Sequence, residues 1–288
     1  MPDIERFLQK MEQAPAQYIR INTLKTSRNE LERRLLSKGF ELRETVLPEV
    51  LQVVRAPMTA GATNEYLLGY YYIQDLSSCI AVDALDAHEG QLILDMAAAP
   101  GGKTTHIAQR MQNTGSIVAL EPNPKRLRSM SFNLDRLGVA NTCILNTSAL
   151  SATGLGKFDR VLLDAPCSCE GVIAKDKTRK TSHSPEDVDY CASRQELLLD
   201  AAIGFCKSGG IIVYSTCSFA PEENEAIVDR AIRKFGVSIE PILYGTEALS
   251  RFGDNEYEKN VQNARRFYPH IDNTTGFFIA RIRMPISS

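Results

Sequence analysis

Short apolar runs alternate with amphipathic segments along most of the chain. The apolar runs are rich in β-branched residues and read as strands: LILDMAA (92–98), SIVALE (116–121), NTCILN, FDRVLLDAP, GIIVYSTCS (210–218) and a late edge strand, FFIARIRM (277–284). Helices are expected between them, from Gly102 to about Met111, from Asn123 to Gly138, around 186–207 and in EENEAIVDRAIRKF. Strands that alternate with helices predict an α/β fold with a doubly wound, mostly parallel sheet.

The first 70 or so residues follow a different pattern. YIRINTLK (18–25) predicts a strand, and Ser27 can cap a helix, RNELERRLLSKG, that closes at Gly39. FELRETVLPEVLQVV then returns as extended chain. We therefore expect a small α+β module over residues 1–72 and the larger α/β domain over 73–288.

Composition narrows the cellular setting. The chain has 288 residues, seven cysteines and a formal net charge of −2. No apolar run is long enough to span a membrane, and the charged start MPDIERFLQK does not resemble a signal peptide. We therefore expect no membrane partner. An odd number of cysteines without a disulfide pattern indicates a reducing, cytoplasmic location. A nucleic-acid partner would have to be held by local basic patches.

The ends of the expected strands carry the candidate chemistry. Ligands of such sheets bind beyond the carboxyl ends of the strands. Four groups of polar or small residues fall there: Asp95 to Lys103, Glu121, Asp164 to Cys169, and Ser215 to Ser218. Topology alone therefore predicts that they meet.

A loop of small residues, AAAPGGKTT (97–105), joins the first of these strands to a helix. Its glycines let the backbone approach a ligand, and the start of a helix offers amide donors. GGKTT resembles the end of a phosphate-binding P-loop, so an ATPase is one alternative, but Ala97 stands where that motif has its first glycine. A tight turn without a ligand is another. Glu121 ends the next strand, where an acid can accept from ribose hydroxyls. Together these features favour a cofactor that carries a nucleoside.

The cysteines divide by context. Cys167 and Cys169 have no second Cys or His pair at a familiar zinc spacing, so we expect no metal. Four others lie in apolar surroundings and are expected in the core: Cys79, Cys143, Cys191 and Cys206. Cys217 lies at a strand end just before a helix expected near Pro221, where a helix N-terminus would lower the pKa of its thiol.

Three motifs carry a resemblance to a known family. LDMAAAPGGKTTHIA, LLDAPCSCEGVI and YSTCSFAPEENE together resemble the Sun-type RNA cytosine-5 methyltransferases of the Nop/Sun family. The similarity runs from about RINTLK (20–25), through YYIQDLSS (71–78), to FYPHIDNTTGFFIA (267–280). It implies a Rossmann-like methyltransferase sheet, a small N-terminal RNA-binding module, S-adenosylmethionine as the cofactor and RNA as the substrate.

The resemblance does not identify which kind of RNA is the substrate. The short chain resembles compact tRNA-modifying members, so we expect tRNA and a monomer, with rRNA as the alternative. The P-loop-like ATPase remains a further alternative. So does a catalytically silent RNA-binding relative.

The resemblance also implies residue roles. Cys217 would be the nucleophile that adds to carbon 6 of cytosine, and Cys167 would help release the product. Asp164 would bind the N3 edge of the base, and Lys103 would orient Asp164 or the base. The cofactor would be held by Ala97, Ala98, Ala99, Pro100, Gly101, Gly102, Lys103, Glu121, Arg126, Ser148 and Asp164. The Pro166-Cys167 pair also resembles the nucleophile of DNA cytosine-5 methyltransferases, which leaves the opposite assignment of the two cysteines open.

The chain departs from the family pattern at three positions. Ser148 stands where an acid commonly lies near the adenine, and Ala97 replaces a common cysteine. Cys169 replaces a glycine or small residue, and we assign it no role. For RNA contacts, KDKTRK (175–180), next to the reactive loop, is the leading candidate, with PKRLR (124–128) and ERRLLSK as further basic segments. A solvated surface is the plain alternative for each of them.

Overall fold

The computed structural model describes residues 3–181 and 184–286, and contacts divide the chain into two compact units. Unit 1 consists of residues 1–15, 93–97 and 148–288, and unit 2 consists of residues 16–92 and 98–147. The domain boundary expected between residues 72 and 73 does not coincide with the limits of these two units, and it stays a prediction. The ends of the two expected domains, residues 1–2 and 287–288, lie outside the described residues.

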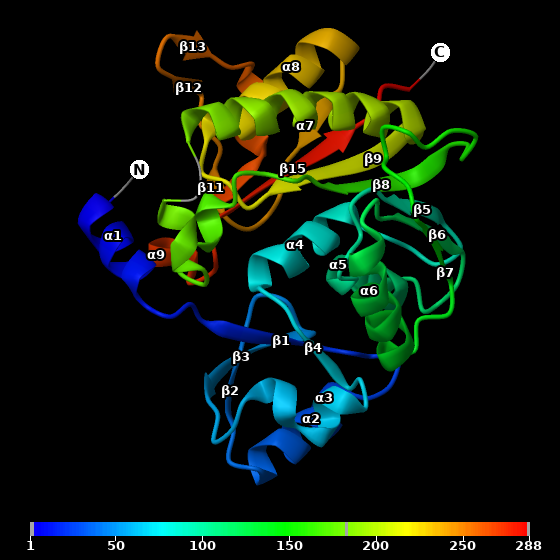
Figure 1. The fold of residues 1–288 in the computed structure, drawn as a ribbon, viewed down its shortest axis with the longest axis vertical. Coiled ribbons are helices and arrows are strands. Elements are labelled where there is room, and N and C mark those ends of the chain that lie inside the picture. The colour runs from blue at the N-terminus through cyan, green and yellow to red at the C-terminus, as the bar shows by residue number, and fades with distance from the viewer. Residues whose placement is uncertain (1–2, 182–183, 287–288) are drawn as a thin grey trace. The chain divides into compact units, whose positions relative to one another are not determined.

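Unit 1 is built around a sheet with helices packed against it (Figure 1). Its helices, including short 3₁₀ turns labelled η, are α1 (Ile4–Glu12), η2 (Glu170–Val172), η3 (Lys177–Lys180), α7 (Pro185–Phe205), η4 (Pro221–Glu223), α8 (Glu225–Phe235), η5 (Lys259–Asn263) and α9 (Pro269–Asp272). Its strands are β5 (Leu92–Asp95), β8 (Phe158–Asp164), β9 (Cys206–Thr216), β10 (Ser238–Glu240), β11 (Thr246–Glu247), β12 (Arg251–Phe252), β13 (Asn255–Glu256), β14 (Arg265–Phe267) and β15 (Phe277–Arg283).

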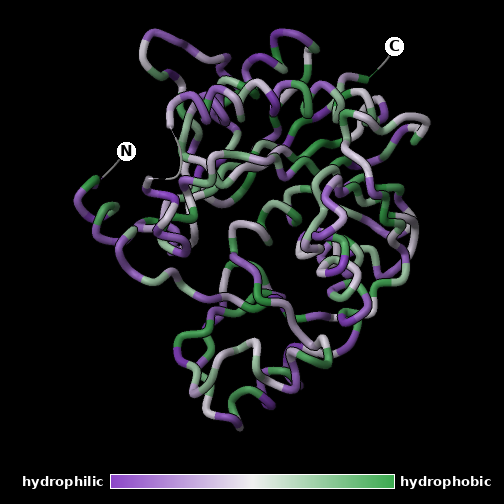
Figure 2. The backbone as a smooth tube through the Cα atoms, in the orientation of Figure 1, coloured by the Kyte–Doolittle hydropathy of each residue, from purple (hydrophilic) through white to green (hydrophobic). Residues whose placement is uncertain are grey.

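The sheet of unit 1 has the strand order β11-β14-β15-β9-β8-β5. β5 pairs with β8 and β8 with β9 in parallel, whereas β15 pairs with β9 antiparallel. α7 packs against β8 and β9, as expected for a helix that covers a parallel sheet. The central strands are hydrophobic along most of their length, while the β12–β13 hairpin is hydrophilic (Figure 2).

One strand was placed wrongly from sequence. FFIARIRM predicts an edge strand, but β15 lies inside the sheet, with β9 on one side and both β14 and β10 on the other. Five of its seven residues are buried. Its second set of partners comes from short strands that carry too few residues to show a period-2 pattern.

Unit 2 contains residues 16–72 of the small module expected at the start of the chain, whereas residues 1–15 belong to unit 1. Its elements are β1 (Gln17–Ile21), α2 (Arg28–Ser37), β2 (Glu41–Glu44), β3 (Val50–Arg55), η1 (Ala60–Ala62), α3 (Asn64–Leu67), β4 (Tyr71–Ile73), α4 (Leu76–Leu85), α5 (Gly102–Arg110), β6 (Ser116–Leu120), α6 (Pro124–Leu137) and β7 (Thr142–Leu145). The first four strands form an antiparallel sheet in the order β2-β3-β1-β4, and β6 pairs with β7 in parallel. The α/β class with a separate small antiparallel sheet is thus confirmed.

Capping signals place two helices correctly. Ser27 accepts a hydrogen bond from the backbone of Glu30 at the start of α2. Asn123 caps the start of α6, Pro124 occupies its first turn and Gly138 ends it in a left-handed conformation. In the part of the chain that the structure describes, no helix combines the length and apolar character needed to cross a membrane.

Candidate active site

The carboxyl ends of three neighbouring strands of unit 1 bear the expected polar residues. Asp95 ends β5, Asp164 ends β8, and Cys217 directly follows β9. In the parallel register Asp95 lies opposite Leu162, and Asp164 lies opposite Ser215. The prediction that these strand ends meet is confirmed within this unit.

Three thiols converge at this edge. The sulfur of Cys167 lies 3.2 Å from that of Cys217 and 3.9 Å from that of Cys169. The backbone N–H of Cys217 donates to the sulfur of Cys167 at 3.3 Å. All three sulfur atoms lie within 4.8 Å of one another and are partly buried. Cys169, to which the sequence assigns no role, therefore belongs to the cluster. Such a cluster suits thiol chemistry and also soft-metal binding, and the absence of a metal stays a prediction.

Two of these thiols, Cys167 and Cys217, have raised pKa values. Hydrogen bonds with Cys169 and Cys217, together with burial, raise the pKa of Cys167. The hydrogen bond with Cys167 lowers the pKa of Cys217, but Cys169, burial and the carboxylate of Asp164 raise it by more. The expectation of a lowered pKa for Cys217 is thus wrong. The segment at Pro221 is a single 3₁₀ turn and α8 begins only at Glu225, so a long helix does not start beside the thiol.

Asp164 is oriented by its neighbour strand. The hydroxyl of Ser215 donates to Oδ1 of Asp164 at 2.8 Å, and Asp164 itself is half-buried. Each carboxylate oxygen can accept more than one hydrogen bond. A carboxylate placed this way suits binding of a nitrogen edge of a base.

Gly171 fixes the course of the loop that carries Cys167 and Cys169. The N–H of Gly171 donates to the carbonyl of Cys217 at 2.8 Å, and its own carbonyl accepts from Gly276 at 2.9 Å. A Cβ at Gly171 would lie 2.7 Å from the carbonyl oxygen of Cys217 and 2.3 Å from that of Gly276. Only glycine fits here. Gly171 was not among the residues expected at the site, although its position two residues after Cys169 was the available signal.

The remaining cysteines only partly follow the core prediction. Cys79 and Cys206 are buried, as expected. Cys143 is exposed and Cys191 is intermediate, so the assignment is wrong for Cys143 and incomplete for Cys191. Cys143 lies on β7, where alternate residues point outward.

The loop of small residues in unit 2 forms a cradle at the start of α5. Gly101 caps this helix with a left-handed backbone and without a side-chain hydrogen bond. The carbonyl of Ala99 accepts from the guanidinium of Arg126, and that of Pro100 accepts from Asn133 at 2.9 Å. Ala98 and Ala99 are buried. A helix start without a capping side chain suits an anionic ligand group.

Glu121 follows β6 in the same unit. Its side chain is buried and accepts from the backbone N–H of Asn123 at 2.8 Å. The guanidinium of Arg126 lies 3.2 Å from the other carboxylate oxygen. Both oxygens keep lone pairs that can accept from hydroxyl groups. Together with the cradle, this donor and acceptor set fits a nucleoside cofactor with an anionic tail.

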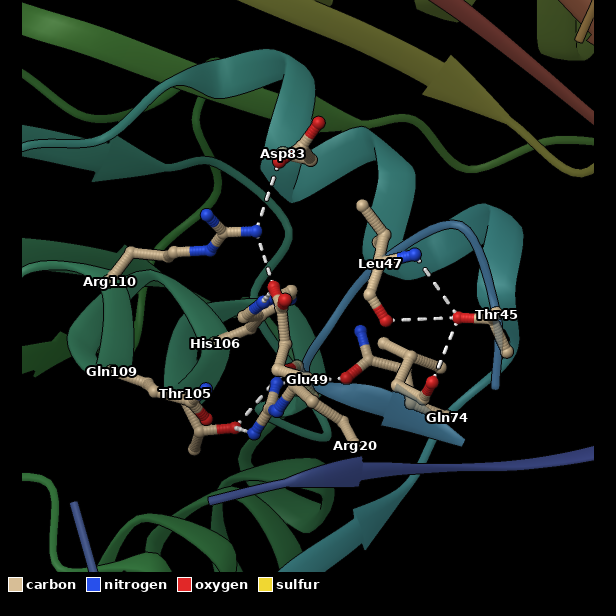
Figure 3. Close-up of polar contacts among 12 residues, drawn as sticks. Arg20, Thr45, Leu47, Glu49, Gln74, Asp83, Thr105, His106, Gln109 and Arg110 are labelled. Atoms are coloured by element: carbon tan, nitrogen blue, oxygen red, sulfur yellow. Dashed lines mark hydrogen bonds and ion pairs between the residues drawn. The ribbon is translucent and has the colours of Figure 1, made fainter. Parts of the chain in front are cut away.

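Buried charges tie α5 to the small antiparallel sheet (Figure 3). Arg20 of β1 is completely buried and donates to the carbonyl of Gly102 at 2.7 Å and to Thr105 at 2.9 Å. Burial lowers the pKa of Arg20 to about 10. The ring of His106 lies 3.2 Å from Glu49, which also pairs with Arg110. The helix that begins at Gly102 is therefore held on one face by the module.

The other predicted residues divide between the units. Ala97, Ser148 and Asp164 belong to unit 1, and Lys103 belongs to unit 2. The hydroxyl of Ser148 accepts from the backbone of Leu150 at 3.3 Å and so caps a turn. The roles of Lys103 toward Asp164 and of Ser148 toward a cofactor stay predictions.

The basic segment 175–180 is largely paired within unit 1. Lys177 donates to the carbonyl of Met11 at 2.6 Å and lies 3.2 Å from Glu12, and Lys180 also pairs with Glu12. Arg179 lies 3.4 Å from Asp176. Any RNA phosphate would compete with these pairs.

Residues 82–283 match the family described as 16S rRNA methyltransferase RsmB/F, and the chain belongs to this family. The chain is 42% identical to human 28S rRNA (cytosine(4447)-C(5))-methyltransferase over 98% of its own length but 36% of that protein. It is 37% identical to the tRNA (cytosine(49)-C(5))-methyltransferase of Pyrococcus abyssi, covering 93% of this chain and 88% of the other.

Two solved structures extend the likeness to three dimensions. A methyltransferase homologue protein from Pyrococcus horikoshii matches with a TM-score of 0.90 and 41% identity, over 97% of this chain and 90% of that one. NSun6 from Pyrococcus horikoshii, solved with SFG, matches with a TM-score of 0.89 and 28% identity, over 98% and 94% of the two chains. The Sun-type resemblance is confirmed. The chain spans well under half of the first curated relatives, for example 36% of the human protein and 45% of the Schizosaccharomyces pombe protein.

Proposed function

We propose that this protein transfers a methyl group from S-adenosylmethionine to carbon 5 of cytosine in RNA. The observation that carries the proposal is the pair of thiols of Cys167 and Cys217, 3.2 Å apart beside Asp164 at the edge of a parallel sheet. Family membership and relatives named as cytosine-C(5) methyltransferases support it. An ATPase would need neither thiol.

The reaction explains why two thiols are useful. Carbon 5 of cytosine is a poor nucleophile. Addition of the Cys217 sulfur to carbon 6 makes carbon 5 nucleophilic enough to accept a methyl group. S-adenosylmethionine supplies the electrophilic methyl group when bound. Asp164 holds the N3 edge of the ring and stabilises the adduct as its charge develops. A base then takes the carbon-5 proton, the electrons of that C–H bond restore the double bond between carbons 5 and 6, and the Cys217 sulfur leaves as a thiolate. Cys167 assists that step. The target base must be unpaired or flipped out to reach the thiols.

The cofactor residues of unit 2 can be given roles in this proposal. The cradle from Ala98 to Lys103 and Glu121 would hold the amino-acid and ribose parts, with Arg126 supporting both. For Ala97, Ser148 and Asp164 of unit 1, a role toward the cofactor stays an expectation from the family resemblance. Because the pKa of the Cys217 thiol is raised, a positive charge nearby would have to favour its thiolate before attack.

The favoured substrate is tRNA. The tRNA relative from Pyrococcus abyssi matches over 88% of its own length, whereas the human rRNA enzyme is matched over 36%. The proposal includes a monomer. It also includes a cytoplasmic location, because a thiol nucleophile requires a reducing compartment.

Replacement of each cysteine tests both the activity and the roles. With S-adenosylmethionine and tRNA, Cys217→Ala should abolish methylation and any covalent complex, because no thiolate remains to attack carbon 6. Cys167→Ala should still form the adduct but stall its breakdown, so protein joined to RNA accumulates as a denaturant-resistant band of reduced mobility. Bisulfite sequencing of the RNA reads methylation independently.

The two outcomes separate the competing assignments. A trapped band in Cys217→Ala and its loss in Cys167→Ala would reverse the roles. Methylation of rRNA but not tRNA by the wild-type protein would favour the rRNA alternative. ATP hydrolysis without methyl transfer would end the proposal.

A further inference from the structure

A buried carboxylate outside the predicted site links the two cysteine loops. Glu223 ends η4, and its side chain is completely buried. Each of the two cysteines is followed by a serine, and the hydroxyls of Ser168 and Ser218 both donate to Glu223. The Ser218 contact measures 2.7 Å, and the backbone N–H of Ser168 adds a further contact at 3.1 Å. The carboxylate thus joins the segments that carry Cys167 and Cys217.

Two more contacts anchor Glu223 to the scaffold of the same unit. Gln195 of α7 is completely buried and donates from Nε2 to Glu223 at 2.7 Å and to the carbonyl of Pro166 at 2.8 Å. The hydroxyl of Tyr214 on β9 donates to the backbone carbonyl of Glu223 at 2.6 Å. The side chain of Glu223 therefore ties both cysteine loops to α7, and its backbone ties the same residue to β9 of the central sheet.

The chemistry of these contacts calls for a carboxylate. The donors that the described residues direct at Glu223 are two hydroxyls, a side-chain amide and a backbone N–H, all of them neutral. A carboxylate is acceptor-only, so it can accept from all of them at once, whereas a glutamine would turn N–H groups toward some of the same donors. Burying a carboxylate without a cation is costly, and well-placed hydrogen bonds must offset that cost. A carboxylate buried only to fill space would therefore destabilise the folded protein.

We propose that Glu223 is a positioning residue that holds Cys167 beside Cys217 so that Cys167 can assist release of the methylated RNA. The inference rests on the proposed function of the two thiols. It predicts that loss of the carboxylate separates the sulfur atoms, which slows breakdown of the adduct more than its formation.

A proximity measurement tests the geometry without RNA. Dibromobimane joins two thiols that lie close together, and mass spectrometry identifies the linked peptides. In a Cys169→Ala background, which leaves Cys167 and Cys217 at this edge, Glu223→Gln should slow the link between them about tenfold or more, the scale of effect of small misplacements. Glu222→Gln changes the same group at the adjacent exposed position and should link at the wild-type rate.

A kinetic measurement tests the function. In single turnovers with S-adenosylmethionine and tRNA, Glu223→Gln should slow release of RNA from the adduct by about 10–100-fold, whereas adduct formation changes less. The trapped band of the Cys167→Ala variant should therefore reappear in Glu223→Gln. If Glu223→Gln does not fold, the double variant Ser168→Ala/Ser218→Ala should show the same split in weaker form, because it removes two donors and leaves the carboxylate in place.

Three outcomes would overturn the proposal. They are a wild-type crosslinking rate in Glu223→Gln, equal slowing of formation and release, and release at the wild-type rate. Absence of any adduct from the wild type and from Cys167→Ala would instead overturn the proposed function, while the crosslinking rates would still decide whether Glu223 positions the thiols.

Discussion

At the scale of single residues, neighbouring thiols influence the protonation of Cys167 and Cys217. Cys169 raises the pKa of both Cys167 and Cys217 through its hydrogen bonds, so the thiol without a sequence-derived role affects both reactive ones. Cys169 also adopts a left-handed backbone conformation with φ of 64°, which residues other than glycine rarely adopt. The cluster favours neutral thiols in the free protein. Activation of the nucleophile then depends on what binds beside it.

Removal of Cys169 should make Cys217 titrate at lower pH. Because the pKa of Cys217 is raised, its thiolate forms only as the pH rises above the ordinary thiol range of about 8.5. Cys169→Ala removes one cause of the increase, so the pH profile of iodoacetamide labelling at Cys217 should move downward. Peptide mass spectrometry follows this site, and exposed Cys143 in the same sample provides the control. An unchanged or upward-shifted profile at Cys217 would contradict this account.

At the scale of elements, one close backbone approach holds α6 against the turn between α3 and β4. Gly69 has φ of 76°, and a Cβ there would lie 1.9 Å from the carbonyl oxygen of Arg136. The guanidinium of Arg136 also lies over the ring of Tyr66, 4.0 Å from its centre. The end of α6 and the small module are therefore fitted to each other at this glycine.

Gly69→Ala should destabilise the protein by about 2–5 kcal/mol, because left-handed strain adds to a clash with backbone that cannot move aside. Gly154 has a similar φ of 71° but open space around it, so Gly154→Ala isolates the conformational part and should cost about 1–2 kcal/mol. Urea unfolding of both variants measures the difference. Equal losses of stability would show that the close approach contributes nothing.

Sequence signals found the elements whose ends depend on neighbouring residues, as at Ser27 before α2 and Asn123 before α6. They failed where partners lie far along the chain. The interior position of β15 depends on β10 and β14, and the pKa of Cys217 depends on thiols in another loop. Motifs identified Cys167, Cys217 and Asp164, but Gly171 and Glu223 act through contacts with segments about 50 residues away, which periodicity cannot reveal.

At the scale of the whole molecule, charge decides how RNA can be held. The net charge is −2, so binding must come from local clusters rather than from the overall field. The segment 175–180 is the cluster nearest in sequence to the reactive loop, and Glu12 pairs with two of its lysines. Exposed pairs of this kind are weak, so RNA phosphates can displace them.

Replacing Glu12 therefore tests whether the basic cluster binds RNA. Glu12→Gln removes the competing carboxylate from Lys177 and Lys180, so tRNA affinity should rise at low salt and fall more steeply as salt increases. Alanine at Lys175, Lys177, Arg179 and Lys180 should do the opposite, weakening binding and flattening the slope of log K against log salt by up to about 0.7–0.9 per lost contact. Filter binding across a salt series measures both, with Glu5→Gln on the same helix as the matched control. If neither variant changes the slope, the segment is a solvated surface and the phosphates are held by other basic residues.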